Sequence, residues 1–273
     1  MGMEKWILDG YGRNLDPQNF GSNPLAIKDS NHYVYEYTKG VAEKWDQLID
    51  WRARFENETQ FFFRILRNRK RTKILDVATG TGFDSIHLIE AGFDVTSLDG
   101  SASMLKEAQR NAKKRKCNLK IIHSDWRSAY KETTEKFDAI ICLGNSFSHL
   151  FTIEDQIKSL KVFNSLLRDD GILIFDHLNF HKINFNDSNF KHKFYYSSKK
   201  AYTQLEYLDD NLARLCYKFP FFFTFYLNLF PINMNYARDL LMENGFNRVK
   251  TFYDFSDTIS NDPEFFIHIG DKN

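Results

Sequence analysis

The sequence predicts an α/β fold, a doubly wound and mostly parallel sheet of seven strands, and three observations support this prediction. Short apolar runs alternate with helical patterns between residues 71 and 179. A glycine-rich turn joins the first of these runs to the first helix. A helix and two strand-like runs close the chain. Its 273 residues suffice for one such domain with additions, or for two small domains.

The first elements form two successive strand–helix units. Lys73-Ile-Leu-Asp-Val77 is a short apolar run that ends in a glycine-containing turn. Residues 85–91 then carry apolar side chains at helical spacing. Residues 95–99 form the next strand, and a helix over about 101–114 begins on a serine N-cap.

The pattern continues with strands at 119–123 and 137–143, a helix at 153–167 and a strand at 171–176. Five strands separated by helical or loop segments imply a parallel sheet with helices on both faces. A helix at 236–243 is stopped by Gly245, and strand-like runs follow it. We expect those two runs, 248–253 and 265–269, to complete the sheet as a hairpin.

Two segments interrupt this pattern. Residues 1–70 hold a polar lead and one long amphipathic helix over about 41–66, which we expect to form a lid over a site. Residues 180–235 alternate aromatic and polar stretches, and we expect an antiparallel insertion over the carboxyl edge of the sheet. The predicted division of the chain is therefore 1–70, 71–179, 180–235 and 236–273. The stretches expected to be strands of the insertion are 194–197, 213–219 and 221–229.

Composition limits the function. A net charge of +1 gives no general attraction to nucleic acid or to an anionic membrane surface. Three cysteines without a CxxC pair, and no metal-ligand spacing, argue against a disulfide framework or a metal site and for a reducing, cytoplasmic location. The start lacks an apolar leader, and no run is long enough to span a bilayer.

Aromatic residues are unevenly distributed. Of 44 Phe, Tyr and Trp residues, 12 lie in residues 1–70, 9 in residues 71–179 and 23 in residues 180–273. This distribution indicates an aliphatic α/β centre with an aromatic enclosure supplied by the flanks. The alternative is that Phe simply fills hydrophobic space.

The strongest motif is Asp76-Val-Ala-Thr-Gly80-Thr-Gly82, between a predicted strand and a predicted helix. Gly80 and Gly82 allow a tight turn and close backbone approach to a ligand. Asp99 ends the next strand and is placed to accept both hydroxyls of a ribose. Together they predict a nucleoside site, the alternative being a plain turn with Asp99 as a helix cap.

The identity of the nucleoside depends on the residues around the glycines. A dinucleotide-binding turn would carry a third glycine where this chain has Ser85, and Asp76 would repel a pyrophosphate. An acid at Asp76 suits instead the positively charged amino acid part of S-adenosylmethionine (SAM). The DxAxGxG pattern resembles the first motif of Rossmann-like methyltransferases.

Polar residues also follow the third and fourth strands. Asp125 can accept from an adenine amino group and Trp126 can lie beside the base, or the two can be an ordinary turn with a half-buried ring. Asn145 can offer its amide oxygen to an attacking amine, and His149 a ring nitrogen. For His149, a hydrogen bond to backbone at a helix end is an equal alternative.

These segments resemble the glycine N-methyltransferase and glycine/sarcosine N-methyltransferase family, from about Tyr33 to the C-terminus. The most specific match is Cys-Leu-Gly-Asn-Ser-Phe-Ser-His-Leu at 142–150. The resemblance implies a Rossmann-like fold, SAM as methyl donor with S-adenosylhomocysteine (SAH) as product, and a role in betaine biosynthesis. The other matching segments are 45–51, 75–86, 92–101 and 103–105.

The resemblance also implies roles for individual residues. Arg54 is expected to reach the carboxylate of SAM, and Tyr37, or alternatively Tyr35, to lie near its sulfonium. The other residues expected at the cofactor are Trp45, Asp76, Ala78, Gly80, Gly82, Asp99, Met104, Asp125, Trp126, Leu143 and His149. The residues expected at the substrate are Asn145, Tyr196 and Tyr217. The expected catalytic residues are Asn145, Tyr37 and Tyr217.

Leu178 departs from the family pattern. The resemblance expects an arginine there, two residues after the acid that ends the fifth strand, to hold the carboxylate of glycine or sarcosine. Leucine cannot form that bidentate contact. Either another base (His177, Lys182 or Arg214) takes the role, or the acceptor is not a free amino acid.

Three hypotheses follow. The first is a SAM-dependent N-methyltransferase for glycine, sarcosine or a close small amine, in which a neutral amine attacks the methyl group in line without a strong base. The second is the same catalyst acting on an amine without a carboxylate. The third is a SAM-binding sensor without turnover. A homo-oligomer is compatible with each of them, and a dehydrogenase is disfavoured by Asp76.

Overall fold

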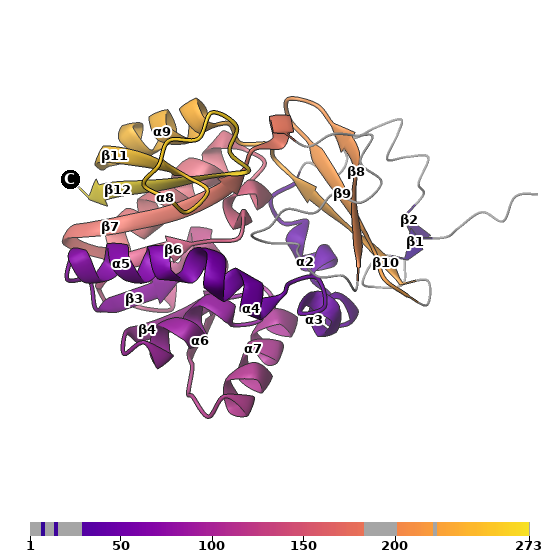
Figure 1. Ribbon diagram of the computed structural model, residues 1–273, viewed down its shortest axis with the longest axis horizontal. Coiled ribbons are helices and arrows are strands. Elements are labelled where there is room, and N and C mark those ends of the chain that lie inside the picture. Colours follow the sequence, from indigo (N-terminus) through magenta and orange to yellow (C-terminus); the bar gives the residue numbers. More distant parts are fainter. Residues whose placement is uncertain (1–6, 9–13, 16–28, 183–200, 221–222, 273) are drawn as a thin grey trace, which may run out of the picture.

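The computed structural model describes residues 7–8, 14–15, 29–182, 201–220 and 223–272. The main sheet has seven strands in the order β11-β12-β7-β6-β3-β4-β5 (Figure 1). The strands from β7 to β5 are parallel, whereas β12 is antiparallel to both of its neighbours. The predicted α/β class, the parallel centre and the closing hairpin are confirmed.

The boundaries of the central elements follow the predicted pattern within a few residues, except that β7 is longer at both ends. Ser101 caps α7 by accepting from the Met104 amide, and Thr152 caps α8 in the same way. The strands are β3 (Lys73–Asp76), β4 (Asp94–Asp99), β5 (Lys120–His123), β6 (Phe137–Cys142), β7 (Leu167–Leu178), β11 (Phe246–Tyr253) and β12 (Phe265–Lys272). The helices are α6 (Phe83–Glu90), α7 (Ala102–Lys114), α8 (Ile153–Leu166) and α9 (Met234–Glu243).

The core has two parts because successive side chains of a strand point to opposite faces. Ile74 and Ile141 belong to a cluster on the face covered by α5 (Gln60–Asn68) and α6. Leu75 and Ile140 belong to a second cluster on the face covered by α8 and α9. The sheet is therefore covered on both sides, as a doubly wound fold requires (Figure 1).

The single long helix expected over 41–66 is wrong, because the chain breaks after Trp45. The structure has α3 (Lys39–Trp45), α4 (Trp51–Arg54), a π-helical turn η2 (Phe55–Thr59) and then α5. Asp50 starts the second helix by accepting from the Arg52 and Ala53 amides. Asp46 accepts from Trp51 Nε1, Thr81 and Asn111, which ties the break to the central domain.

A second sheet lies beside the carboxyl end of the first (Figure 1). It consists of antiparallel strands in the order β10-β9-β8. β9 (Ala213–Lys218) and β10 (Thr224–Leu229) confirm two predicted strands, whereas β8 (Tyr202–Leu208) was not expected. The stretch 194–197 lies outside the described residues. The short helix α2 (Tyr33–Glu36) contacts β10.

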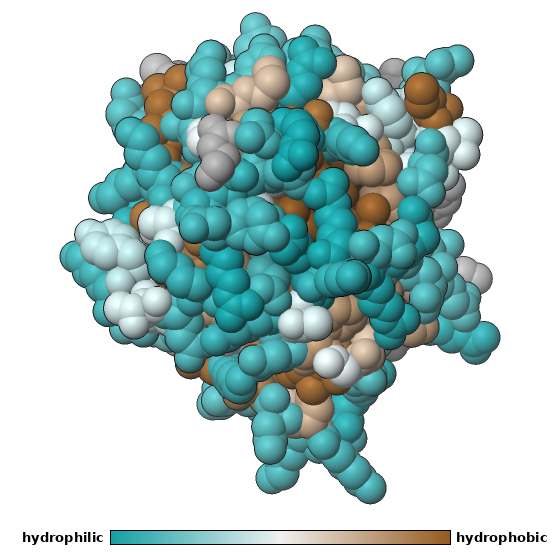
Figure 2. Space-filling view, turned by 90° about the vertical axis from the view of Figure 1, so that its left-hand side faces the viewer, coloured by the Kyte–Doolittle hydropathy of each residue, from teal (hydrophilic) through white to brown (hydrophobic). Residues whose placement is uncertain are grey.

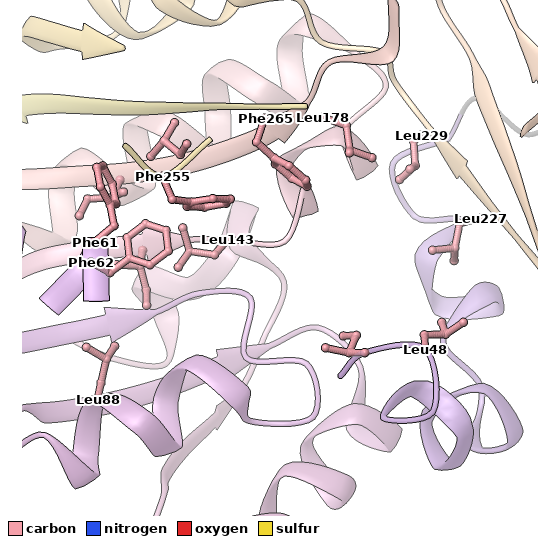
Figure 3. Packing of buried hydrophobic residues seen from close by; sticks show 14 of the residues in the cluster. Leu48, Phe61, Phe62, Leu88, Leu143, Leu178, Leu227, Leu229, Phe255 and Phe265 are labelled. Carbon is pink, nitrogen blue, oxygen red and sulfur yellow. The ribbon is translucent and has the colours of Figure 1, made fainter. Parts of the chain in front are cut away.

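The two sheets share one hydrophobic cluster. Leu227 and Leu229 of β10 belong to the same cluster as Leu143 and Leu178 at the ends of β6 and β7. Figure 3 shows Leu178 between Phe265 and Leu229. The insertion is thus packed against the carboxyl edge of the main sheet, as expected.

The remaining elements are short. They are β1 (Ile7–Leu8), β2 (Asn14–Leu15) and the 3-10 turns η3 (Trp126–Lys131), η4 (Ser146–His149) and η5 (Phe180–Lys182). The end of the molecule away from the second sheet is mainly hydrophilic, with hydrophobic residues in small separate groups (Figure 2). Within the described ranges, no helix is both long and apolar enough to cross a membrane. The division of the chain into four segments stays a prediction.

Candidate functional site

A pocket opens at the carboxyl ends of the parallel strands, with about 890 Å³ of empty space including the part open to solvent. Its walls come from the loops after β3, β4, β5 and β6 and from the N-terminal segment. It lies where β3 has β4 on one side and β6 on the other, the point at which such sheets bind ligands.

The glycine-rich turn uses backbone conformations that favour glycine. Gly80 has φ +53° and Gly82 has φ +94°. A Cβ on Gly82 would lie 3.1 Å from the Ile86 side chain and 3.2 Å from Ala108, so this residue also lets α6 and α7 approach. Gly80 lines the pocket, whereas Gly82 supports it from behind.

Asp99 is on the pocket wall at the end of β4. One carboxylate oxygen accepts from the Gly80 amide at 2.7 Å and the other from the Ser101 amide at 2.8 Å. Burial raises the pKa of Asp99 to about 6, which still leaves it largely ionised at neutral pH. Each oxygen retains acceptor capacity, so the carboxylate can receive two neighbouring hydroxyls.

Asp76 does not take the position expected for it. It is buried behind the wall, where its oxygens accept from Ser85 Oγ at 2.6 Å and from the Ala78 amide at 3.2 Å. Burial raises the pKa of Asp76 to about 7. Ser85 thus holds the carboxylate in the core, off the pocket wall, and the expected contact of Asp76 with the cofactor stays a prediction. In the segment that follows β3, the acidic residue that lines the pocket is Asp84.

Arg54 is nearly buried on the pocket wall. Its guanidinium donates to Asp84 at 2.8 Å and to Glu58, and it lies 4.1 Å from the centre of the Phe83 ring. The π-helical turn after Arg54 places Glu58 beneath it. The arginine is therefore held rigidly with its charge largely balanced by two carboxylates.

Asp125 and Trp126 also line the pocket. Four donors already occupy the Asp125 carboxylate: the Arg127 amide, two nitrogens of the Arg127 guanidinium, and Tyr33 Oη at 3.2 Å. Tyr33 comes from α2, so the N-terminal segment closes this end of the pocket. Trp126 donates to the Val77 carbonyl and stacks on Phe147, with the two rings 11° from parallel.

The opposite end of the pocket is aromatic. Tyr37 and Trp45 lie edge to face with centroids 5.4 Å apart. Tyr217 stacks on Phe225 at 4.7 Å, and both rings lie within 6.4 Å of Trp45. Such faces attract cations. His149 joins this group because its Nε2 lies 2.8 Å from Tyr37 Oη.

Asn145 is held in a left-handed conformation, with φ 58°. Its backbone amide donates to Asp176 at 2.7 Å, and its Oδ1 accepts from Ser148 Oγ at 2.9 Å and from the Leu178 amide at 3.0 Å. Two protein donors therefore already occupy Oδ1, and the expected contact of this oxygen with an amine stays a prediction. Asn145 can instead donate from Nδ2.

Leu178 is buried, with 1% of its surface exposed. The three bases considered as replacements for the expected arginine are not on the pocket wall. His177 is buried against His268, Lys182 pairs with Asp262, and Arg214 pairs with Glu206 and covers the Tyr226 ring. Of the described residues that line the pocket, only Arg54 is a lysine or arginine.

The pocket thus gathers most of the expected residues. Those on its wall are Tyr37, Trp45, Arg54, Ala78, Gly80, Asp99, Met104, Asp125, Trp126, Leu143 and His149. Asn145, Tyr217 and Leu178 lie buried behind the wall, and Tyr196 lies outside the described residues. Tyr33 and Asp84 also line the pocket, and the sequence did not single them out, although both lie in the part of the chain that resembles the family. The ranges that the structure describes contain no group of three or more potential metal ligands.

Comparison with known proteins agrees with this geometry. A family model for a methyltransferase domain matches residues 74–171. The chain is 47% identical over 257 residues to a glycine/sarcosine N-methyltransferase of Aphanothece halophytica, covering 94% of this chain and 97% of that protein. It is 44% identical over 256 residues to one of Halorhodospira halochloris, covering 93% and 96%. Human glycine N-methyltransferase is 37% identical over 163 residues, which is 54% of this chain and 55% of that protein.

Solved structures share the fold. A SAM-dependent methyltransferase from Clostridium acetobutylicum superposes with a TM-score of 0.69 at 18% identity, covering 86% of this chain and 98% of that one. A SAM-bound amino pentose methyltransferase from Micromonospora echinaspora gives a TM-score of 0.57 at 16% identity, covering 82% and 92%.

Proposed function

Since this chain belongs to the glycine/sarcosine N-methyltransferase family, we propose that it transfers a methyl group from SAM to the amine of glycine or sarcosine. The products are the N-methylated amino acid and SAH, a step that would supply betaine biosynthesis. The acceptor is a small molecule and not a nucleic acid, because the net charge of +1 gives no attraction to a polyanion. Three free cysteines suit a reducing, cytoplasmic setting.

The donor end of the pocket fits the nucleoside part of SAM. The observation that carries this is Asp99, a half-buried carboxylate fixed by two backbone amides with acceptor capacity left for a ribose. Trp126 and Met104 would flank the base, and Arg54 would face the carboxylate of the donor. When bound, SAM supplies an electrophilic methyl group on a sulfonium.

The aromatic end of the pocket would hold the amine. Tyr37 and Trp45 present rings that exclude water and favour positive charge, and Tyr217 packs against Trp45 from behind the wall. The protein thereby positions a desolvated amine in line with the methyl group, and positioning of this kind supplies most of the rate enhancement. Tyr37 Oη is the polar atom that can accept from the amine.

The carboxylate of the acceptor would meet neutral donors. Asn145 would offer Nδ2, since Oδ1 already accepts two hydrogen bonds, and Leu178 has only an apolar side chain where an arginine is expected. A neutral donor holds a carboxylate less tightly than a guanidinium does. We therefore expect a weaker preference for glycine over carboxylate-free amines than an arginine would give.

A coupled assay of SAH release tests the proposed activity. The substrates are glycine, sarcosine, dimethylglycine and ethylamine, each across a range of concentrations. We expect turnover of glycine and sarcosine with kcat/KM at least about 10-fold above that of ethylamine, since one charge-assisted hydrogen bond is worth 1.5–3 kcal/mol. SAH binding without turnover of any amine would contradict the proposal.

One observation, the apolar Leu178, favours a second candidate function: methylation of a small amine without a carboxylate. Ethylamine would then exceed glycine in kcat/KM. In that case Leu178→Arg is expected to restore the preference for glycine, with thermal melting checked for each protein. No change in preference would assign the carboxylate to another residue.

A further inference from the structure

Glu36 is a buried carboxylate that the proposed methyl transfer does not use. It is the last residue of α2, next to Tyr37, and 7% of its surface is exposed. Its Oε1 accepts from the backbone amide and the side-chain Nδ2 of Asn228, both at 2.7 Å. Its Oε2 has no hydrogen bond to any described residue. Burying an oxygen in this way costs free energy, and such groups are often retained for a function.

The Oε2 atom faces His149, which connects it to the pocket. His149 Nδ1 lies 3.6 Å from Glu36 Oε2, and His149 Nε2 lies 2.8 Å from Tyr37 Oη. Both Tyr37 and His149 line the pocket, whereas Glu36 does not. Three titratable side chains therefore form a row from the aromatic end of the pocket into the protein.

We propose that Glu36, acting through His149 and Tyr37, accepts the proton that an amino acid must lose before its amine can attack the methyl group. This inference rests on the proposed function. An aliphatic amine resembles a lysine side chain, whose pKa is about 10, so it arrives at neutral pH as an ammonium without a lone pair. A site that excludes water must provide its own route for that proton.

The transfer balances without any further reactant. The ammonium N–H proton passes to Tyr37 Oη, the Tyr37 hydroxyl proton passes to His149 Nε2, and the His149 Nδ1 proton passes to Glu36 Oε2. Tyr37 and His149 end neutral, Glu36 ends as a carboxylic acid, and the amine ends neutral with its lone pair. After the product leaves, the proton returns by the same row to water.

The geometry fits this direction of transfer. A carboxylate at Oε2 selects the His149 tautomer with its proton on Nδ1, which leaves Nε2 to accept from Tyr37. Tyr37 lines the pocket, and a hydroxyl that donates to His149 can still accept a proton. The 3.6 Å between Nδ1 and Oε2 is longer than a hydrogen bond, as catalytic contacts often are before substrate binds.

The charged groups around Glu36 set its proton affinity. His32 Nε2 lies 3.9 Å from Oε1, and Arg214 of β9 acts on Glu36 through space. Burial outweighs the Asn228 hydrogen bonds and Arg214, and raises the pKa of Glu36 to about 8. Burial, with a smaller contribution from His32, lowers the pKa of His149 to about 3. At pH 7 a minor fraction of the protein then carries Glu36 as a carboxylate, and this fraction is the form that accepts the proton through the neutral histidine.

Glu36→Gln tests the proposal because glutamine keeps an oxygen for Asn228 and lacks only the proton acceptor. At pH 7 we expect kcat/KM for glycine to fall about 10- to 100-fold. This is below the roughly 100- to 10,000-fold typical of general-base catalysis, because only the ionised fraction of Glu36 acts at that pH. At pH 10, where much of the amine is already neutral in water, we expect the loss to shrink to about 3-fold or less. The affinity for SAH should stay within about 3-fold of wild type at both pH values.

Glu107→Gln is the matched control, because Glu107 is similarly buried but pairs with Arg110 away from the pocket. It should retain wild-type kinetics at pH 7 and pH 10. A Glu36→Gln protein that shows no loss, or the same loss at both pH values, overturns the proposal. The second pattern is what a purely structural role at the edge of β10 would give.

Tyr37→Phe decides the question if Glu36→Gln does not fold. It cuts the row at its first atom, so the same loss at pH 7 and the same recovery at pH 10 are expected. An equal loss at both pH values overturns the proposal here too. The proposed function is tested apart from this by the wild-type protein, whose turnover of glycine at pH 7 does not depend on which residue accepts the proton.

Discussion

Asp99 combines two tasks at the end of β4. It fixes the glycine-rich turn through the Gly80 amide and the start of α7 through the Ser101 amide. It also stands on the pocket wall, where the same two oxygens can receive ribose hydroxyls. We therefore expect the affinity for the donor to depend on an ionised carboxylate at this position.

Asp99→Asn is expected to weaken SAH binding about 10- to 100-fold, because a hydrogen bond to a charged group is worth about 1.5–3 kcal/mol and one oxygen becomes a donor. Isothermal titration calorimetry with SAH measures the change. Asp94→Asn is the matched control, since Asp94 begins the same strand and pairs with exposed Lys120. Equal affinities for the Asp99 variant and wild type would remove Asp99 from the donor site.

Single residues show where sequence reasoning ends. Asp99 was assigned to the wall from its place at a strand end, and the structure puts it there. Asp76 also ends a strand, yet Ser85 draws it into the core. The side-chain oxygen of Asn145 was expected to accept from the substrate amine. In the structure it accepts from the backbone amide of Leu178, 33 residues away in the sequence. Strand position is local information, whereas hydrogen-bond partners depend on packing between distant segments.

At the scale of elements, a histidine row ties together the strands that complete the sheet. Oγ1 of Thr251 on β11 lies 3.0 Å from Nδ1 of His268 on β12. His268 Nε2 in turn lies 3.1 Å from Nε2 of His177 on β7. His177 Nδ1 lies 3.0 Å from the Leu178 carbonyl, to which it donates. Both histidines are neutral in this arrangement. Burial lowers the pKa of His177 to about 4 and that of His268 well below its usual range.

This row predicts an acid-sensitive junction between β7 and β12. An unfolded histidine, with a pKa near 6.5, takes up a proton before His177 does, so its contribution to stability is lost as the pH falls from about 6.5 to about 4. Relative to His177→Gln, wild type should lose about 2 kcal/mol of unfolding free energy between pH 7.5 and pH 5. Urea unfolding at the two pH values measures this difference.

His181→Gln is the control for that experiment, because His181 is exposed in the turn after β7. Its unfolding free energy should follow the wild-type curve. Parallel curves for wild type and His177→Gln would show that the buried pair does not contribute to the pH dependence.

Elements with a regular pattern could be predicted, and the lid could not. The central strands are apolar runs between turn residues, so periodicity located them within a few residues. The segment 41–66 carries a helical pattern throughout, yet Asp46 and Asp50 end one helix and begin another. The contacts of Asp46 with Thr81 and Asn111 outweigh helix propensity there, and local sequence does not reveal them.

At the scale of the whole molecule, two sheets meet at one site. The parallel sheet supplies the donor end of the pocket, and one hydrophobic cluster joins its edge to the aromatic strands of the insertion. The uneven distribution of aromatic residues predicted this enclosure. It did not predict that Tyr33 and Tyr37 close opposite ends of the pocket, through Asp125 and His149.

The most direct test of the account is the fate of the methyl group. SAM labelled with ¹³C in its methyl group is incubated with the protein and glycine, and the products are identified by mass spectrometry. We expect ¹³C-methyl sarcosine together with an equal amount of SAH. The account would be contradicted if SAM binds at micromolar protein concentration but neither glycine nor sarcosine gains the label. That result would identify the pocket as a sensor of SAM.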